Sequence, residues 1–258
     1  MQVQSRLAAM TVLVTGAGTG FGAAIAYRAA QEGADVVIHY NRSKDGAEAT
    51  AARVRGLGRS ALVVQADLST WEGIRSLVRD AFAGAGRIDV AVNNVGNVVA
   101  EQWSWRDLTQ EWLDRVIDVD VKGTLLCTHE FGLRMLDQGG GSIVNIGSAV
   151  VVRGSVRAPQ YAASKYAILG LTKSYAAAFA PTVRVNVFAP GFMETATTLA
   201  RGDWRSGRRE RLVSDTPMGH IPGPEELAGA ALFLATPDAA HITGGLLLAD
   251  GGLSMVGA

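Results

Sequence analysis

Short apolar runs alternate with longer helix-like stretches along the whole chain. The runs are rich in Val, Leu and Ile and apolar on both faces, which is typical of buried parallel strands. We expect strands at residues 12–14, 35–40, 61–65, 89–93, 142–146, 184–188 and 246–248, and helices at 21–32, 47–57, 71–83, 110–136, 160–179 and 225–235. Strands separated by helices predict right-handed βαβ crossovers. The predicted fold class is therefore α/β, a doubly wound parallel sheet of about seven strands with helices on both faces.

The chain is expected to form one domain over residues 1–258, because no linker, repeat or charge block divides it. With 258 residues and 48% hydrophobic content, it can bury a full core, which excludes a disordered protein. The segment 192–224 has Gly, Pro and Arg scattered through it and is long for a connection within a domain. We expect it to be an irregular substrate lid or binding loop.

Charge and cysteine usage exclude several classes of function. The 24 basic residues balance the 24 acidic ones, whereas binding to nucleic acid or an anionic membrane needs a basic surface. The lone Cys127 cannot form an internal disulfide, and the four histidines lack ligand spacing, so we expect no metal site. Residues 7–27 carry no charge and are long enough for a membrane span, but their glycines and threonines favour a strand, a turn and a helix. We expect a soluble, cytoplasmic protein.

A glycine-rich turn joins the first expected strand to the first expected helix. It has the sequence T-G-x-x-x-G-x-G, with Gly16, Gly20 and Gly22 at the fixed positions. Glycines let the backbone turn tightly and approach a ligand, and the following helix N-terminus offers N–H groups to a pyrophosphate. A glycine cluster alone could be a simple tight turn, but its place between the first strand and the first helix favours dinucleotide binding.

This variant of the glycine motif resembles that of the short-chain dehydrogenase/reductase family, and further motifs follow in order at consecutive strand ends. They are Asp67, Asn93-Asn94-Val95-Gly96, Ser148, Tyr161-Ala-Ala-Ser-Lys165, Pro190-Gly191, Ile242-Thr-Gly-Gly and Asp250-Gly-Gly. The resemblance covers nearly the whole chain and implies a single-domain Rossmann-like enzyme that binds a nicotinamide cofactor. The cofactor-binding residues expected from these motifs and from the glycine turn are Gly16, Thr19, Gly20, Phe21, Gly22, Asn41, Arg42, Ser43, Asp67, Leu68, Asn94, Val95, Gly96, Tyr161, Lys165, Pro190, Gly191 and Thr195.

The tip of the second strand indicates which nicotinamide cofactor is used. NAD binders usually carry an acidic residue there for the ribose 2′-hydroxyl, but this tip has the sequence His39-Tyr-Asn-Arg-Ser43 with no carboxylate. Arg42 could pair with a 2′-phosphate and Ser43 could donate a hydrogen bond to it, so NADP(H) is favoured over NAD(H). The alternative is that Arg42 is an ordinary loop arginine.

Two cofactor candidates also have structural interpretations. By resemblance Asp67 contacts the adenine, but it could equally be a turn residue, since Ser69-Thr-Trp-Glu72 next to it fits a helix capping box. Asn93 and Asn94 could likewise be turn residues that satisfy local backbone groups.

The strongest chemical signal is a tyrosine followed four residues later by a lysine. A tyrosine ionises near pH 10, so it needs help to act as an acid–base group at neutral pH. Tyr161 and Lys165 would share one face of a helix, where the ammonium would favour the phenolate. The resemblance implies that Ser148 binds the substrate carbonyl and that Lys165 also holds the nicotinamide ribose. It further implies that the three residues, with the nicotinamide as hydride donor or acceptor, interconvert a ketone and a secondary alcohol.

One position departs from the family pattern. Members usually carry an asparagine in the helix before the fifth strand, where it is thought to hold a water in a proton relay, and here that position is Asp120. Asp120 keeps the backbone carbonyl, so the relay remains possible. A carboxylate there could alter the charge balance of Lys165 and the pH optimum, and we keep Asp120 as a catalytic candidate.

The substrate is expected to be a small carbonyl or alcohol. Arginines in and near the lid, among them Arg153, Arg157, Arg201, Arg205, Arg208, Arg209 and Arg211, could bind an anionic substrate or could simply be solvated. Trp103 and Trp105 could line the pocket or pack elsewhere.

Two alternative functions and an oligomeric state are also compatible with the sequence. The chain looks similar to 3-oxoacyl-acyl-carrier-protein reductases, but it lacks basic residues at the two places where carrier docking is expected, with only Arg134 close to the first. A non-catalytic NADP(H)-sensing regulator is the alternative from another class, with Asp120 as its only support. The resemblance also implies a homotetramer.

Overall fold

The computed structural model describes residues 5–96 and 103–255. Within these residues, seven parallel strands form one sheet in the order β3-β2-β1-β4-β5-β6-β7. The strands are β1 (Thr11–Val14), β2 (Asp35–Tyr40), β3 (Ala61–Gln65), β4 (Val90–Asn93), β5 (Gly141–Ile146), β6 (Val183–Pro190) and β7 (Leu246–Ala249). The predicted fold class is confirmed, and each predicted strand agrees with an observed one to within two residues at either end.

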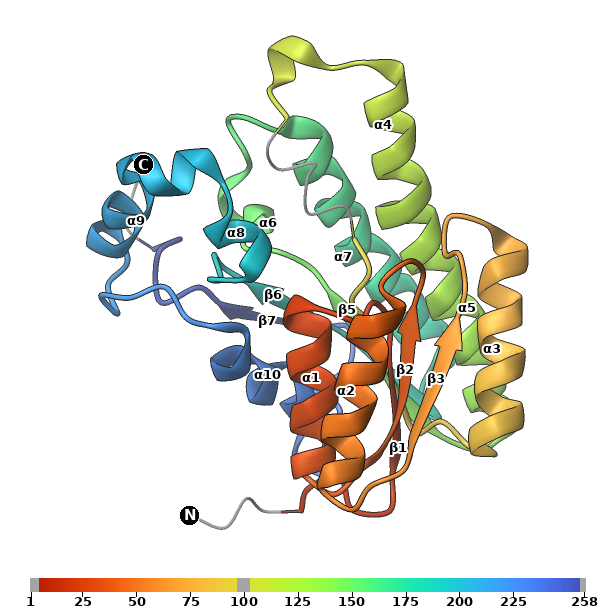
Figure 1. Ribbon diagram of the computed structural model, residues 1–258. Helices are drawn as coiled ribbons and strands as arrows, with labels where there is room; N and C mark the ends of the chain where they lie inside the picture. The colour runs from red at the N-terminus through yellow and green to blue at the C-terminus, as the bar shows by residue number, and fades with distance from the viewer. Residues whose placement is uncertain (1–4, 97–102, 256–258) are drawn as a thin grey trace.

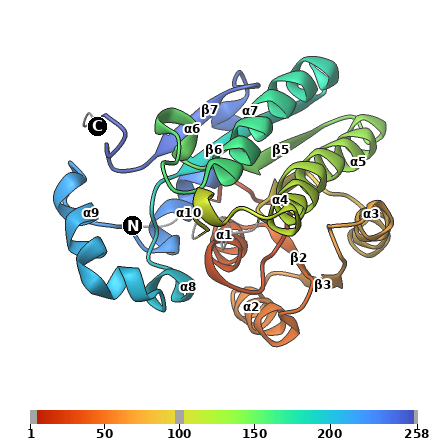
Figure 2. The same cartoon turned by 90° about the horizontal axis from the view of Figure 1, so that it is seen from above.

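Helices cover both faces of the sheet (Figures 1 and 2). One layer contains α1 (Gly20–Gln31), α2 (Lys44–Gly56) and α10 (Pro224–Phe233), and the other contains α3 (Trp71–Ala85), α5 (Thr124–Asp137) and α7 (Pro159–Phe179). Among the described residues, no helix combines the length and the apolar character that a membrane crossing requires. The uncharged segment near the N-terminus is the strand β1, the glycine turn and α1, as predicted.

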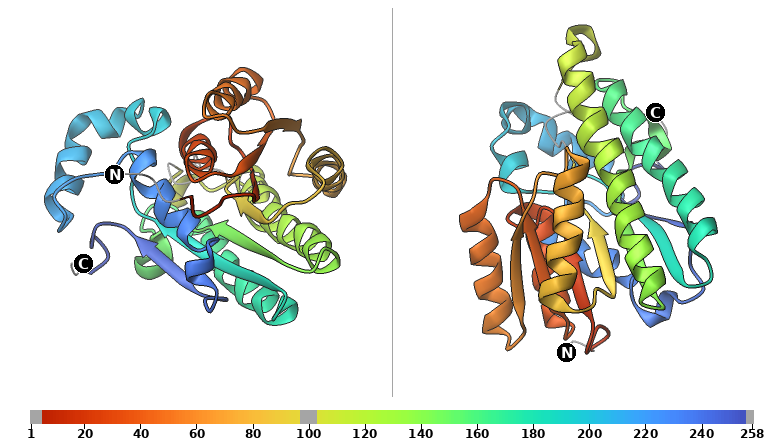
Figure 3. Two further views of the ribbon diagram at one scale, coloured as in Figure 1. Left: turned by 90° about the horizontal axis from the view of Figure 1, so that it is seen from below. Right: turned by 90° about the vertical axis from the view of Figure 1, so that its right-hand side faces the viewer.

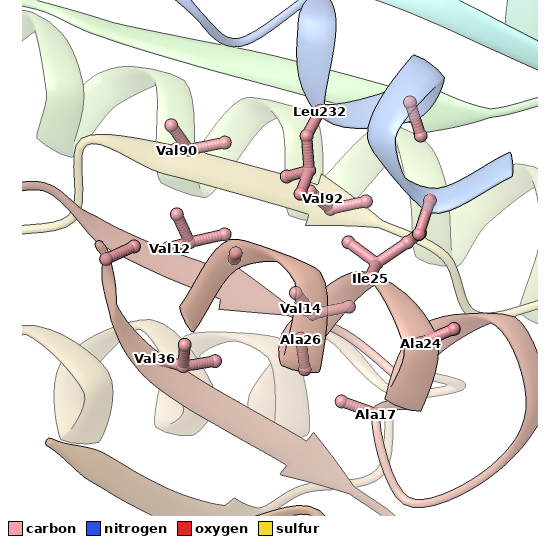
Figure 4. Packing of buried hydrophobic residues seen from close by; sticks show 14 of the residues in the cluster. Val12, Val14, Ala17, Ala24, Ile25, Ala26, Val36, Val90, Val92 and Leu232 are labelled. Atoms are coloured by element: carbon pink, nitrogen blue, oxygen red, sulfur yellow. The ribbon is translucent and has the colours of Figure 1, made fainter. Parts of the chain in front are cut away.

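The core lies between the sheet and each helix layer. Side chains alternate along a strand, so Val12 and Val14 pack toward α1 while Leu13 packs toward the α3–α5 side. Figure 4 shows Val12, Val14, Val90 and Val92 on the side of the sheet that faces α1 and α10. Both faces of the central strands are buried, which explains their continuous apolar runs.

A buried polar chain ties the two middle strands to α7. Asn93 Nδ2 donates to Asn145 Oδ1 over 2.8 Å, and Asn145 Nδ2 donates to Thr172 Oγ1 over 2.9 Å. Thr128 of α5 joins them, donating to Asn145 Oδ1 over 3.1 Å. Asn93 is therefore the last residue of β4 and a cross-strand link rather than a turn residue, and the chain fixes α7 against the sheet.

The predicted helix at 110–136 is interrupted. α4 (Gln110–Val116) continues into a π-helix, η3 (Ile117–Gly123), before α5 begins. The three form one long column beside α3 and α7 (Figure 3, right). The apolar spacing predicts one continuous helix because a π-turn widens the helix only locally. Such bulges occur frequently at functional sites.

The segment 192–224 is not irregular as expected, because it contains short helices. These are α8 (Ala196–Leu199), η4 (Trp204–Arg208) and α9 (Arg209–Asp215), which lie beside the carboxyl ends of the strands at the upper left of Figure 1. The remaining short helices are η2 (Trp105–Asp107), α6 (Val150–Arg153) and η5 (Pro237–Ala239). The short helices α8, η4 and α9 border the edge of the sheet formed by the carboxyl ends of the strands, where open α/β sheets bind ligands, whereas η5 lies near the amino end of β6.

Candidate active site

The glycine turn after β1 is shaped to hold a ligand against its backbone. Gly16 has φ of +65°, a conformation that glycine adopts without strain. A Cβ on Gly22 would collide with the Gly16 carbonyl oxygen and lie 2.6 Å from Asn94 Nδ2, so α1 approaches the turn more closely than any side chain allows. Thr19 is the N-cap, with its side chain making no capping bond, and Phe21 is buried in the core. The cradle fits a dinucleotide pyrophosphate at a helix N-terminus.

Asn94 and Val95 fasten the loop after β4 to this turn. Asn94 donates from its backbone to Thr15 Oγ1 over 2.8 Å and from its side chain to Thr15 O over 2.9 Å. The Val95 N–H donates to the same hydroxyl. Gly96 follows, and a Cβ there would lie 3.1 Å from both Asp120 and Lys165. The loop thus extends from the glycine turn to the catalytic candidates.

His39 links the glycine turn to the loop after β3, a role that was not predicted from the sequence. It is buried in β2, its Nδ1 accepts the Gly16 N–H over 3.1 Å, and its Nε2 lies 3.1 Å from the carbonyl oxygen of Ala66. The imidazole must be neutral, with its proton on Nε2, to make both bonds. Burial lowers the pKa of His39 to about 4, against the opposing effects of the Ala66 bond and the Asp67 charge. The sequence feature that could have indicated this role is a histidine within the apolar run of β2.

We expect His39 to make the fold acid-sensitive. The unfolded chain takes up the histidine proton near pH 6.5 and the folded chain only near pH 4, so stability falls between these values, by about 3 kcal/mol in full. In a His39→Asn variant this component is absent. The free energy of unfolding, measured with urea at pH 7 and at pH 4.5, should differ between parent and variant more at pH 7 than at pH 4.5. An equal difference at both values would contradict the role of His39.

The loop after β2 lies against the glycine turn. A Cβ on Gly46, in the first turn of α2, would collide with the Gly18 carbonyl oxygen, and one on Gly18 would lie 2.9 Å from the Ser43 carbonyl oxygen. Ser43 is the N-cap of α2 but makes no side-chain capping bond. Asn41, Arg42 and Ser43 are all exposed beside the turn.

Asp67 and Leu68 follow β3 at the same edge. Asp67 Oδ1 accepts from the backbone N–H and the hydroxyl of Ser69, and these two bonds, with help from the Arg42 charge, lower the pKa of the Asp67 carboxyl. The structural interpretation of Asp67 as a turn residue is therefore confirmed. The expected capping box is wrong by one residue, because Thr70 is the N-cap and accepts from the N–H of Gly73. Leu68 is buried next to Gly123 of η3.

Tyr161 and Lys165 share one face of α7, as their spacing predicts. Lys165 Nζ lies 5.6 Å from the centre of the Tyr161 ring and 3.5 Å from the carbonyl oxygen of Ile146, its hydrogen-bond acceptor in β5. Lys165 is buried, and Tyr161 is partly exposed. An ammonium at this distance can stabilise a phenolate, and a phenol that is open to solvent on one side can reach a ligand.

Asp120 lies on the other side of the Lys165 ammonium. Its Oδ1 is 3.3 Å from Lys165 Nζ, and its side chain is fully buried within η3. Burial by itself would lower the pKa of Lys165, but the charges of Asp120 and Tyr161 and the Asp120 hydrogen bond raise it above its ordinary value. Lys165 is therefore held as a cation inside the protein.

Ser148 follows β5 and is fixed through its neighbours. The Gly147 N–H donates to the Phe188 carbonyl and the Ala149 N–H donates to the Pro190 carbonyl, so the serine is held between two bonds to β6. Its hydroxyl oxygen accepts from the Val150 N–H over 3.3 Å. This ladder places Ser148 next to Pro190 and Gly191, at the same edge as Tyr161.

The Pro190-Gly191 segment leads back to the glycine turn. Gly191 packs against Asp250, since a Cβ there would lie 2.8 Å from the Asp250 backbone. Thr195 caps α8, accepting from the Thr198 N–H, and its methyl group would lie 3.9 Å from a Cβ on Gly20. The structure thus brings the expected cofactor residues together along one edge of the sheet.

Most of the described arginines in and near the segment 192–224 form ion pairs. Asp203 accepts from Arg201 and Arg208 and lies 3.7 Å from Arg157, and Arg209 pairs with Glu194. These bonds, that of Arg201 first, hold the pKa of the Asp203 carboxyl far below its usual value. The side chain of Arg205 lies outside the described part of the chain. Ion pairing favours a structural role for these arginines over the binding of an anionic substrate.

Aromatic side chains pack against one another within the segment 192–224. Trp204 is buried against Phe192 with ring centres 6.2 Å apart, and the Arg208 guanidinium lies 5.3 Å from the Phe192 ring. Trp103 stacks on Trp112 of α4, whereas Trp105 is half exposed and its backbone N–H donates to the Arg157 carbonyl. Trp103 is thus a packing residue. Among the described residues, no cluster of three His, Cys, Asp or Glu side chains could hold a metal ion, and burial raises the pKa of the Cys127 thiol to about 12.

The chain is similar to known oxidoreductases in sequence and in fold. The sequence matches the enoyl-(acyl carrier protein) reductase family over residues 16–254. It is 38% identical to an uncharacterized oxidoreductase of Methylorubrum extorquens, over 96% of this chain and 99% of that one, and 33% identical to a 3-oxoacyl-[acyl-carrier-protein] reductase of Staphylococcus aureus, over 95% and 98%. A short-chain dehydrogenase/reductase from Mycobacterium marinum superposes with a TM-score of 0.89 at 31% identity, covering 96% of each chain.

The fold and these similarities together define an oxidoreductase with a nicotinamide-binding α/β domain. The chain belongs to the short-chain dehydrogenase/reductase family, as the order of its sequence motifs predicts.

Proposed function

We propose that this protein is an NADP(H)-dependent oxidoreductase that reversibly reduces a ketone or related carbonyl to a secondary alcohol. The observation that carries the proposal is the arrangement of Lys165 beside Tyr161, with Ser148 fixed at the neighbouring strand end. A nicotinamide supplies or accepts the hydride when bound. Everything else the reaction needs comes from the side chains of this site.

Each residue of the site has a distinct role in this proposal. Ser148 donates a hydrogen bond to the carbonyl oxygen and so stabilises the negative charge that develops there. Tyr161 transfers its phenolic proton to that oxygen in reduction and takes a proton from the alcohol in oxidation. Lys165 stabilises the resulting phenolate and, by family resemblance, holds the ribose next to the nicotinamide.

The activity is tested by following oxidation of NADPH with a panel of ketones, diketones and β-ketothioesters, and reduction of NADP⁺ with the matching alcohols. Turnover that depends on Tyr161 would support the proposal. Cofactor binding with no turnover on any compound would instead support the NADP(H)-sensing regulator. The enzyme is favoured because the chain has Ser148, Tyr161 and Lys165 at the spacing of the family motif and because Lys165 lies beside Tyr161.

The preference for NADP(H) rests on the tip of β2. There the exposed Arg42 lies close enough to Asp67 to help lower the pKa of its carboxyl group. The Ser43 hydroxyl makes no capping hydrogen bond to α2. No carboxylate occupies the tip of β2 itself, where NAD binders usually place one. Arg42 and Ser43 would hold the 2′-phosphate while Asp67 and Leu68 border the adenine.

We expect an Arg42→Ala variant to bind NADPH about 10- to 100-fold more weakly, because a charge-assisted bond to a phosphate contributes about 1.5–3 kcal/mol. Its affinity for NADH should not change, which makes NADH the internal control. Fluorescence titration of parent and variant with both cofactors measures the effect. An equal loss for both cofactors, or a parent that prefers NADH, would remove Arg42 as the phosphate anchor.

A carrier-protein reductase is the second candidate, favoured by the similarity to the Staphylococcus aureus enzyme. Arg134, in the last turn of α5, lies over the ring of Phe82 at 4.9 Å and is thereby packed against the protein surface. A basic docking site near α5 would need more than this one guanidinium. A strong preference for acyl-carrier-bound over simple β-ketothioesters would establish this candidate.

We also propose a homotetramer, on the basis of family resemblance. Exposed apolar side chains on the α4–α5 column and on α7, among them Leu113, Leu133 and Tyr166, support a helix-to-helix contact, and Leu246 of β7 supports a second one. Analytical ultracentrifugation tests this assembly, and a monomer at all concentrations would contradict it.

A further inference from the structure

The Asp120–Lys165 pair is a departure whose geometry has consequences for the reaction. In place of an amide, a buried carboxylate lies 3.3 Å from the ammonium that faces Tyr161. Both side chains have less than a tenth of their surface exposed, so solvent screens their interaction weakly. Gly96 packs against both, and a Cβ at that position would lie 3.1 Å from Asp120 Oδ1 and 3.1 Å from Lys165 Nζ.

One ammonium therefore serves two anionic partners. Lys165 faces Asp120 from η3, the Tyr161 ring from its own helix and the Ile146 carbonyl from β5. Of these three groups, Asp120 and Tyr161 are the titratable ones, and both raise the pKa of Lys165. The Asp120 carboxylate lies 3.3 Å from the ammonium, whereas the Tyr161 phenolate forms only when the phenol gives up its proton. Because the ammonium is already neutralised by Asp120, it stabilises the phenolate less than it would beside an asparagine.

We propose that Asp120 is a positioning residue that holds Lys165 in place and keeps Tyr161 in its phenol form near neutral pH, so that the site favours carbonyl reduction there and oxidises alcohols efficiently only in alkaline solution. This inference rests on the proposed function and adds to it a working direction. The carboxylate acts through Lys165 and has no contact with substrate in this role.

The proton balance gives the two directions opposite requirements. In reduction the carbonyl carbon gains a hydride from the reduced nicotinamide, and the carbonyl oxygen gains the proton of Tyr161, which leaves a phenolate to be reprotonated from water. In oxidation a phenolate at Tyr161 takes the hydroxyl proton while the carbon loses hydride to the oxidised nicotinamide. A site that keeps the phenol protonated therefore speeds reduction and slows oxidation at the same pH.

The test is the pH dependence of kcat/KM in both directions for the parent and an Asp120→Asn variant. The variant should shift the acidic limb of alcohol oxidation down by about one pH unit, which raises oxidation about tenfold at a fixed pH on that limb. The alkaline limb of carbonyl reduction should move down by a similar amount. A residue with a purely structural role would lower kcat without moving either limb.

Asp118→Asn is the matched control. Asp118 lies two residues away in the same π-helix and pairs with the exposed Lys122 over 2.6 Å, so this variant removes the same charge at the surface. Its pH profiles should coincide with those of the parent. Coincident profiles for Asp120→Asn as well, or a shift of equal size in Asp118→Asn, would overturn the proposal.

A second measurement keeps the inference separate from the proposed function. The tyrosinate absorbance of Tyr161→Phe, subtracted from that of the parent across a pH titration, reports the ionisation of Tyr161 without any turnover, and the same subtraction is made in the Asp120→Asn background. The ionisation should move to lower pH in Asp120→Asn, with Asp120→Ser prepared in parallel as a smaller uncharged replacement. Absence of turnover in the parent would refute the proposed function alone, whereas an unmoved titration would refute the role of Asp120 alone.

Discussion

A Tyr161→Phe variant should lose about 10²- to 10⁴-fold in kcat, the range over which a positioned acid–base group contributes to catalysis. The ring and its packing beside Lys165 are kept, so only the phenolic proton is removed. NADPH affinity should stay within about twofold of the parent, because the cofactor cradle lies mainly on other elements. Stopped-flow or steady-state oxidation of NADPH with the best carbonyl of the panel measures the loss.

Tyr166→Phe is the control for this experiment. Tyr166 is on the same helix and is half exposed, and removal of its hydroxyl should leave turnover unchanged. Near-parental turnover in Tyr161→Phe would contradict the mechanism. A parallel loss of NADPH binding would indicate that the phenol also supports the cofactor site.

The second large effect is expected from Gly22→Ala. The added methyl group would collide with the Gly16 carbonyl and meet Asn94 Nδ2 at 2.6 Å, so either α1 or the loop after β4 must move. Overpacking of this kind costs about 1–3 kcal/mol in stability. The displaced turn should also bind NADPH more weakly by at least about tenfold, since the N–H groups that face the pyrophosphate would shift.

Gly170→Ala is the matched control for added volume. Gly170 lies in α7, is exposed, and has no neighbouring atom within 4 Å of the new methyl group outside its own helix. It should leave NADPH binding unchanged and raise stability by about 0.5–1 kcal/mol, the usual gain of Ala over Gly within a helix. Thermal unfolding and cofactor titration of both variants give the comparison, and unchanged binding in Gly22→Ala would contradict the tight cradle.

The positions of the strands along the chain followed from local sequence. Strands buried on both faces leave continuous apolar runs, so β2 and β3 were predicted to the residue. The spacing of Tyr161 and Lys165 likewise fixes their shared helix face without any tertiary information.

Other features depend on contacts that no local pattern contains. The π-helix η3 accommodates the buried Asp120 next to Lys165, which comes from a different helix. His39 links two loops that lie 23 and 27 residues away in sequence. The helices of the lid are short and are held by the ion pairs of Asp203, so their apolar periodicity is too brief to detect.

The contact between Gly18 and Gly46 has a consequence for attempts to exchange one coenzyme for the other. The glycine turn that would recognise the pyrophosphate and the start of α2, next to the residues that would recognise the ribose, touch backbone to backbone, because a Cβ on Gly46 would collide with the Gly18 carbonyl oxygen. A redesign of coenzyme preference can therefore replace the side chains at Arg42 and Ser43, but an inserted residue or a longer loop there would displace the turn next to it. Coenzyme preference in this protein can therefore be altered by side-chain substitutions but not by changes in the length of the loop after β2.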